Sequence, residues 1–219
     1  MKGLSEIEIK ARQQKARVIF RELKKLFPDA KIALNFSNSW ELLVAVILSA
    51  QCTDKMVNVV TEKLFKKYKS VDDYANADLV EFEKDIHSTG FYHNKAKNIL
   101  ATARMIKERH DGKIPCTMDE LLELPGVARK TANVVLGNAC GVVVGIAVDT
   151  HVRRLANLLG LSSQYDPVKI EQDLMRIFPA TQWNIITYLL IEYGRKYCPA
   201  KKHDHDNCPL TGALAGQNH

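Results

Sequence analysis

The sequence lacks a long apolar run. The longest extends only from Leu42 to Leu48, whereas a membrane-spanning helix needs about 20 such residues. The first residues, Met1 to Phe20, include both acidic and basic side chains, which is typical of neither a signal peptide nor a transit sequence. Internal repeats and low-complexity segments are also missing. We therefore expect a globular protein in the cytoplasm of a bacterial or archaeal cell, without a membrane partner.

Cysteine is scarce and irregularly placed. The 219 residues contain five cysteines, an odd number without the regular spacing of a disulfide framework. Such usage favours a reducing compartment. A chain of this length has room for one large domain or two small ones.

Acidic residues are the minority among the charged side chains. There are 25 Asp and Glu against 31 Lys and Arg, which gives a formal net charge of +6. A basic surface suits a polyanion such as nucleic acid. Many basic proteins nevertheless bind none, so the charge alone leaves the partner open.

Signals for β-strands are almost absent. Only the run Val142-Val143-Val144 has strand propensity, and no second strand exists to pair with it. We expect an extended connection there and an all-α fold. Periodicity, caps and breakers predict helices over residues 5–27, 40–50, 54–68, 71–76, 78–86, 95–110, 118–124, 129–139, 150–159, 167–178 and 179–194, with an irregular tail from Tyr197.

Two of these helices form a hairpin around which the chain is organised. Thr117 and Glu120 have capping-box spacing and start the first helix. Pro125-Gly126 ends it, because proline disfavours a helical residue before it and glycine accepts a positive φ. The second helix begins at Arg129. Backbone N–H groups at its start suit a phosphate.

The segments LPGVARKTANVVL and VDTHVRRLANLLGL resemble the endonuclease III family of DNA glycosylases. The resemblance covers the chain from about Ala33 to Cys208. Ala128 departs from the family pattern, which most often has a second glycine there. A methyl group at this position is compatible with N–H donation to phosphate if its φ is negative. The matching positions are Leu124, Pro125, Gly126, Val127, Arg129, Lys130, Thr131, Ala132, Val148, Asp149, Thr150 and His151.

The resemblance implies two helical lobes with the active site in the cleft between them. A six-helix barrel domain would span residues 31–142 and contain the helix-hairpin-helix at about 118–140. The second helical domain would combine residues 1–30 with 143–219. The hairpin and Asp149 would then face each other.

The family's catalytic residues map onto Lys130 and Asp149. Lys130 would attack C1′ of the sugar, form a Schiff base and permit β-elimination. Taken alone, Lys130 would be read as a solvated helix lysine. Asp149 would stabilise the cationic sugar, and it also has the position of an N-cap. These two roles of Asp149 are compatible.

Further residues are implied to contact DNA. Gln51 and Phe91 would insert into the duplex where the damaged base is flipped out; the alternatives are a polar helix end and a core aromatic. His151 would line the pocket or act only as a cap residue. Arg153 and Arg154 would contact phosphate or be surface charge. The proposed phosphate-binding turn consists of Gly126, Val127 and Ala128, followed by Arg129.

The resemblance predicts a base-excision-repair DNA glycosylase with lyase activity at apurinic or apyrimidinic (AP) sites, acting on oxidised pyrimidines. Its partner would be double-stranded DNA that contains damaged bases or abasic sites, and we expect a monomer. One alternative is a monofunctional glycosylase, against which Lys130 argues. Another is a non-catalytic helix-hairpin-helix module, which would not need Asp149.

The family's iron–sulfur pattern near the C-terminus, Cys-x6-Cys-x2-Cys-x5-Cys, is incomplete here. Cys198 and Cys208 hold the first and third places, but His205 and Leu214 hold the second and fourth. A cubane cluster takes four thiolates, so we expect no cluster and no metal. The alternative is a zinc site formed by Cys198, His203, His205 and Cys208. Without metal, the tail would be mobile or held by packing of Pro199, Pro209 and Leu210.

Overall fold

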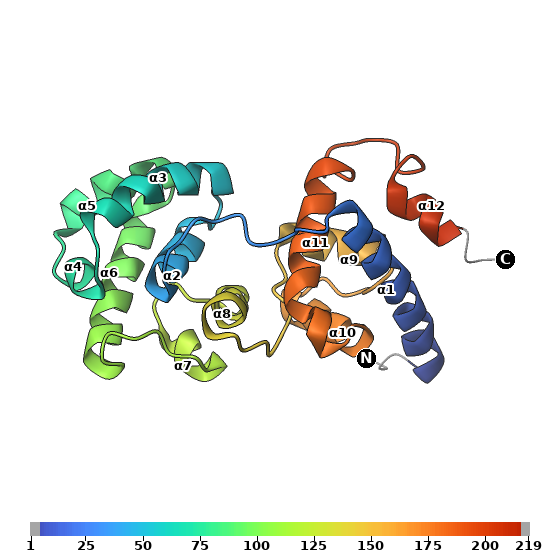
Figure 1. Ribbon diagram of the computed structural model, residues 1–219, viewed down its shortest axis with the longest axis horizontal. Coiled ribbons are helices and arrows are strands. Elements are labelled where there is room, and N and C mark those ends of the chain that lie inside the picture. Colours follow the sequence, from blue (N-terminus) through green and yellow to red (C-terminus); the bar gives the residue numbers. More distant parts are fainter. Residues whose placement is uncertain (1–4, 216–219) are drawn as a thin grey trace. The chain divides into compact units, whose positions relative to one another are not determined.

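The structure is a computed structural model that describes residues 5–215, and its regular elements are all helical (Figure 1). The all-α prediction is confirmed. Within the described range Val142, Val143 and Val144 form no strand and have no strand to pair with, as expected. None of the described helices is long and apolar enough to cross a membrane.

The chain divides into two compact units. One comprises Ala33–Val144, and the other combines the described residues up to Ile32 with those from Gly145 onward. The first unit contains α2 (Ser39–Leu48), α3 (Asp54–Lys67), α4 (Val71–Ala75), α5 (Leu79–Ile86), the 3-10 helix η1 (His87–Thr89), α6 (Tyr92–Arg109), α7 (Met118–Glu123), α8 (Arg129–Val135) and the π-helix η2 (Leu136–Cys140). The second contains α1 (Glu6–Leu26), α9 (Thr150–Leu158), α10 (Pro167–Ile177), the 3-10 helix η3 (Ala180–Gln182), α11 (Trp183–Lys196) and α12 (Pro209–Ala215).

The first unit is built around α2, which is apolar nearly all round and packs against α3, α6 and α8. This is the buried helix that the sequence predicts over residues 40–50. It begins one residue earlier than predicted, because Asn38 caps it and accepts a hydrogen bond from the Glu41 N–H. The buried core of the unit includes an aromatic cluster of Trp40, Tyr68, Tyr74 and Phe82.

The second unit joins the two ends of the described chain. Helix α1 packs against α10, α11 and α12, and its buried Ile19 and Leu23 belong to the same apolar core as Leu189 and Leu210. The capping box of Ser5 and Glu8 starts α1.

Three parts of the chain differ from the sequence-based prediction. Helix α6 begins at Tyr92 instead of Lys95, because Phe91 takes a left-handed backbone conformation and reverses the chain just before it. The hairpin's second helix changes to a π-helix at Leu136. The tail from Tyr197 is not wholly irregular, since α12 forms where Leu210 becomes fully buried.

Candidate functional site

The hairpin between α7 and α8 requires glycine at its turn. Gly126 has a φ of 78°, and a Cβ atom there would lie 2.9 Å from the Cβ atom of Asn98 on α6. A side chain at position 126 would therefore strain the backbone and collide with α6. The Thr102 hydroxyl of α6 donates a 2.9 Å hydrogen bond to the Pro125 carbonyl and fixes the turn to the same helix.

The turn leads directly into α8. Ala128 is exposed, with an extended backbone at φ −91° and ψ 168°, and no side chain caps the helix. The negative φ meets the condition under which the methyl group is tolerated. Lys130 is the second residue of α8, and it is half-buried, as is Arg129. The hairpin thus presents Lys130 one residue after the helix begins.

Asp149 is the N-cap of α9. Its Oδ1 atom accepts a 2.8 Å hydrogen bond from the Val152 N–H, and its side chain is half-buried. The predicted cap role is therefore present. Asp149 lies in the second unit, whereas Lys130 lies in the first.

The side chains that follow Asp149 pack within the second unit. The half-buried His151 faces α11, since a Cβ atom at Gly194 would lie 2.8 Å from its Nδ1 atom. The Arg154 guanidinium donates hydrogen bonds to the carbonyl oxygen and the Sγ atom of Cys198. Arg154 is thus engaged inside its own unit, while Arg153 is exposed.

Gln51 and Phe91 share an unusual backbone conformation in the first unit. Their φ angles are 52° and 49°, in the left-handed region that non-glycine residues rarely adopt. Both side chains are exposed, Phe91 by 63%. The alternative of Phe91 as a core aromatic is therefore wrong. Left-handed residues of this kind cluster at ligand-binding sites.

A buried lysine connects the loops that carry these two residues. The Lys95 ammonium donates 2.8 Å hydrogen bonds to the carbonyl oxygens of Leu48 and Thr89. Leu48 ends α2 shortly before Gln51, and Thr89 ends η1 shortly before Phe91. Burial lowers the pKa of Lys95 below its usual value. Sequence reasoning missed this residue, because a lysine on a predicted basic helix reads as solvated.

Four metal-ligating side chains meet in the second unit. Cys198, His203, His205 and Cys208 place one ligand atom each within 4.8 Å of one another. Both cysteines are buried, and burial raises the pKa of the Cys208 thiol. The expectation of a tail without metal is not confirmed, since the donors of the alternative zinc site lie together.

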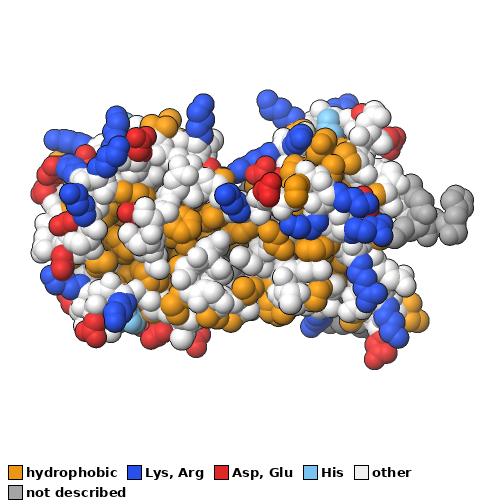
Figure 2. Space-filling model, viewed as in Figure 1, with side chains coloured by type: hydrophobic (Ala, Val, Ile, Leu, Met, Phe, Trp, Pro, Cys, Tyr) orange, Lys and Arg blue, Asp and Glu red, His pale blue; other side chains and the backbone are white. Residues whose placement is uncertain are grey.

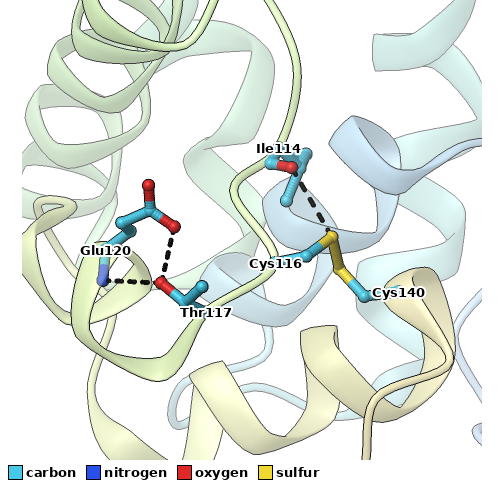
Figure 3. Close-up of a disulfide and its surroundings, with 5 residues drawn as sticks. All are labelled: Ile114, Cys116, Thr117, Glu120 and Cys140. Atoms are coloured by element: carbon cyan, nitrogen blue, oxygen red, sulfur yellow. Dashed lines mark hydrogen bonds between the residues drawn. A yellow bond between two sulfur atoms is a disulfide. The ribbon is translucent and has the colours of Figure 1, made fainter.

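The first unit also contains a disulfide between Cys116 and Cys140 (Figure 3). Cys116 precedes α7 and Cys140 ends η2, and their Cα atoms lie 5.7 Å apart. The bond therefore joins the beginning and the end of the helix-hairpin-helix segment. Cys52, Cys198 and Cys208 are free. The cysteine spacing did not indicate this pair. The disulfide also disagrees with the expectation that the cysteines are reduced.

Charged side chains are mixed on the surface. On the face that Figure 2 shows, both units carry Lys and Arg side chains with Asp and Glu between them. On this face the positive charges are therefore interspersed with negative ones. Among the described residues no single basic patch dominates this face, so the residues that contact a polyanion have to be identified from local geometry.

Comparison with known proteins covers both units. Residues 44–180 match the HhH-GPD superfamily of base excision DNA repair proteins. An endonuclease III from Synechocystis sp. is 49% identical over 201 residues, which cover 92% of this chain and 92% of the relative. A solved non-covalent endonuclease III–DNA complex has a TM-score of 0.87 at 43% identity and covers 94% of this chain and 99% of that chain. A trapped endonuclease III–DNA covalent intermediate has a TM-score of 0.86 at 46% identity, with coverages of 90% and 93%.

Proposed function

We propose, from the premise that this chain belongs to the endonuclease III family of HhH-GPD base excision DNA repair proteins, that it removes oxidised pyrimidines from duplex DNA. Family membership makes the chain a bifunctional DNA glycosylase and AP lyase. The observation that carries the assignment of residues is the position of Lys130, one residue inside the helix that follows the hairpin.

Lys130 is the proposed nucleophile. Its amine has to be neutral to attack C1′ of the sugar, and a helix N-terminus together with partial burial favours the neutral form. The attack forms a bond from Nζ to C1′, while the bond to the base breaks and the base departs with the electron pair. Opening of the sugar ring gives a Schiff base. Loss of a C2′ proton then expels the 3′ phosphate and cuts the strand.

Asp149 is the proposed partner of this chemistry. The negative charge of its carboxylate would stabilise the positive charge that develops on the sugar as the base departs. The hydrogen bond from the Val152 N–H holds the carboxylate in one orientation. The carboxylate would also help to activate Lys130.

The exposed loops of the first unit are the proposed duplex contacts. Phe91 would act as a wedge where the damaged base leaves the stack, with Gln51 filling the space beside it. Their left-handed backbones and exposure support this role. Lys95 holds both loops to the same point of the unit.

The hairpin turn is the proposed phosphate-binding site. Gly126 and Ala128 are exposed beside the start of α8, where backbone N–H groups suit a phosphate oxygen. Val127 is buried, and its N–H donates a 3.1 Å hydrogen bond to the Leu124 carbonyl oxygen, so Val127 would shape the turn between the two exposed residues. Arg129 adds a positive charge. His151 keeps a proposed role in lining the lesion pocket through the half-exposed part of its ring, although its Nδ1 atom faces Gly194 on α11.

The remaining proposals concern organisation and cofactor. The unit Ala33–Val144 would be the six-helix barrel domain with the helix-hairpin-helix, and the other unit the second helical domain. The protein would act as a monomer on damaged DNA in the cytoplasm. A four-iron cluster does not fit the residues present, because only two of the four clustered donors are thiols.

Borohydride trapping tests the proposed function. With a thymine-glycol duplex, the wild-type chain should form a covalent adduct that peptide mapping places on Lys130, and it should release the base and nick the strand. Lys130→Ala should form no adduct. Lys169→Ala is the matched control, since Lys169 is an exposed lysine in the first turn of α10, and it should be trapped at the wild-type yield.

The two alternatives give different results in the same experiment. Base release without nicking or an adduct would indicate a monofunctional glycosylase. Duplex binding without base release would indicate a non-catalytic module. An adduct that persists in Lys130→Ala at the wild-type yield would contradict the assignment of the nucleophile.

A further inference from the structure

The Cys/His group of the second unit has the spacing of a metal centre. The Sγ atom of Cys208 lies 3.4 Å from Nε2 of His203, and Sγ of Cys198 lies 3.7 Å from Nδ1 of His205. A tetrahedral zinc ion with Zn–S bonds of ~2.3 Å and Zn–N bonds of ~2.0–2.1 Å separates its donors by about 3.3–3.8 Å. Both measured distances fall in that range.

We propose that Cys198, His203, His205 and Cys208 bind one structural zinc ion. All four donor atoms lie within 4.8 Å of one another, so small side-chain movements would bring the group to the separations of about 3.3–3.8 Å around a single zinc ion. Two thiolates and two neutral imidazoles are a common donor set for structural zinc. The two thiolate charges balance the two positive charges of the ion.

The surroundings orient the donors. Nδ1 of His203 lies 2.9 Å from the Lys201 carbonyl oxygen, which accepts the ring N–H and leaves the lone pair of Nε2 for the metal. Zinc-bound histidines are usually held in this way. On the other side, Arg154 donates to the Sγ atom and the carbonyl oxygen of Cys198. These two bonds hold Cys198 in place beside His205.

Iron–sulfur clusters fit this geometry less well than a single ion does. A cubane takes one thiolate on each of four irons, and Leu214 at the fourth sequence position offers no ligand. A two-iron centre with Cys and His ligands keeps the histidines on one iron and the cysteines on the other. Here each cysteine instead lies next to a histidine.

Zinc would fasten the C-terminal helix to the second unit. Cys198 follows the end of α11, and Cys208 immediately precedes Pro209 at the start of α12. Helix α12 packs on α1 and buries Leu210 completely. A pocket of 390 Å³, bordered by His205 and Leu214 among others, gives an ion access to the group. The four proposed ligands include neither Lys130 nor Asp149, so this inference does not depend on the proposed catalytic roles.

Metal analysis of the full, untagged chain tests the proposal. The protein is produced in zinc-supplemented medium and purified under reducing conditions. Inductively coupled plasma mass spectrometry should then find one zinc per chain. Cys208→Ser and His205→Asn should reduce the zinc content to near zero. Cys52→Ser, which removes a free cysteine of the first unit, should retain one zinc.

A second measurement does not depend on how the variants fold. Wild-type chain stripped with a chelator and titrated with Co²⁺ should show the intense visible bands of a tetrahedral thiolate site, saturating at one ion per chain and abolished by Zn²⁺. Wild-type chain without zinc after loading would overturn the proposal. So would zinc retained by Cys208→Ser, or iron with inorganic sulfide and a brown colour.

Discussion

The ammonium group of Lys95 donates a 2.8 Å hydrogen bond to the carbonyl oxygen of Leu48, the last residue of α2. A second bond of equal length reaches Thr89, so one buried side chain joins the loop that carries Gln51 to the loop that carries Phe91. The two loops proposed to enter the duplex therefore share one internal support. Replacing Lys95 should therefore disturb both loops.

Lys95→Met tests this support. The substitution keeps the length of the side chain but leaves two carbonyl oxygens without their donor, which costs about 1–3 kcal/mol for each buried group. We expect a lower midpoint of unfolding in urea and weaker binding to a lesion duplex. Lys97→Met, at an exposed position on the same helix, is the control. If both variants unfold at the same midpoint, Lys95 does not have this role.

Phe91→Ala separates duplex contact from stability. Because the ring is 63% exposed, its removal should change the free energy of unfolding by less than about 0.5 kcal/mol, whereas a buried phenylalanine would cost ~3–5 kcal/mol. Lesion binding should weaken if Phe91 is a wedge. Tyr165→Ala removes another exposed aromatic ring and should leave binding unchanged. Equal lesion affinities of the two variants would refute the wedge.

Asp149→Asn separates catalysis from capping. An asparagine oxygen still accepts the hydrogen bond from the Val152 N–H, so stability should change little, while the loss of charge should strongly reduce base release with duplex binding retained. The matched control is Asp166→Asn, since Asp166 caps α10 in the same unit with a 3.0 Å bond to the Lys169 N–H. Normal turnover in Asp149→Asn would show that Asp149 acts only as a helix cap.

Reduction of the Cys116–Cys140 disulfide should destabilise the protein. The bond closes a loop of 24 residues, for which chain entropy predicts a loss of about 2–4 kcal/mol in the free energy of unfolding. Cys116→Ser should lower the unfolding midpoint under oxidising conditions and equal the wild type in reductant. Cys52→Ser should match the wild type in both. Thiol titration of the denatured, chelated chain should find three free thiols; five would show that the pair is reduced.

Much of the fold was predictable because its signals are local. The caps Thr53 and Asp166 act on N–H groups three residues away, and Pro125-Gly126 ends α7 by its own backbone preference. The hairpin and both proposed catalytic positions follow from such short motifs. Their spatial relation does not, because Lys130 and Asp149 belong to different units.

What escaped prediction depends on distant partners. One of the two carbonyl oxygens that accept from the Lys95 ammonium belongs to a residue 47 positions away, so the local sequence does not indicate that this lysine is buried. Cys116 pairs with a cysteine 24 residues later among several candidates. Helix α12 has only seven residues and depends on α1 at the opposite end of the described chain. Residue propensities likewise do not predict the left-handed backbone conformation of Phe91, because the surrounding structure stabilises that conformation.

The packing of α1 determines when it can fold into its unit during synthesis. Helix α1 is translated before α10, α11 and α12, the helices against which it packs, and the first of these begins roughly 140 residues after α1 ends. At about 5–20 residues per second, the side chains of Ile19 and Leu23 wait roughly 7–28 seconds on the ribosome for their partners. The unit Ala33–Val144 is complete within that interval. The nascent chain can therefore fold the unit Ala33–Val144 before α1 is covered, and the apolar face of α1 stays unshielded until α10, α11 and α12 emerge.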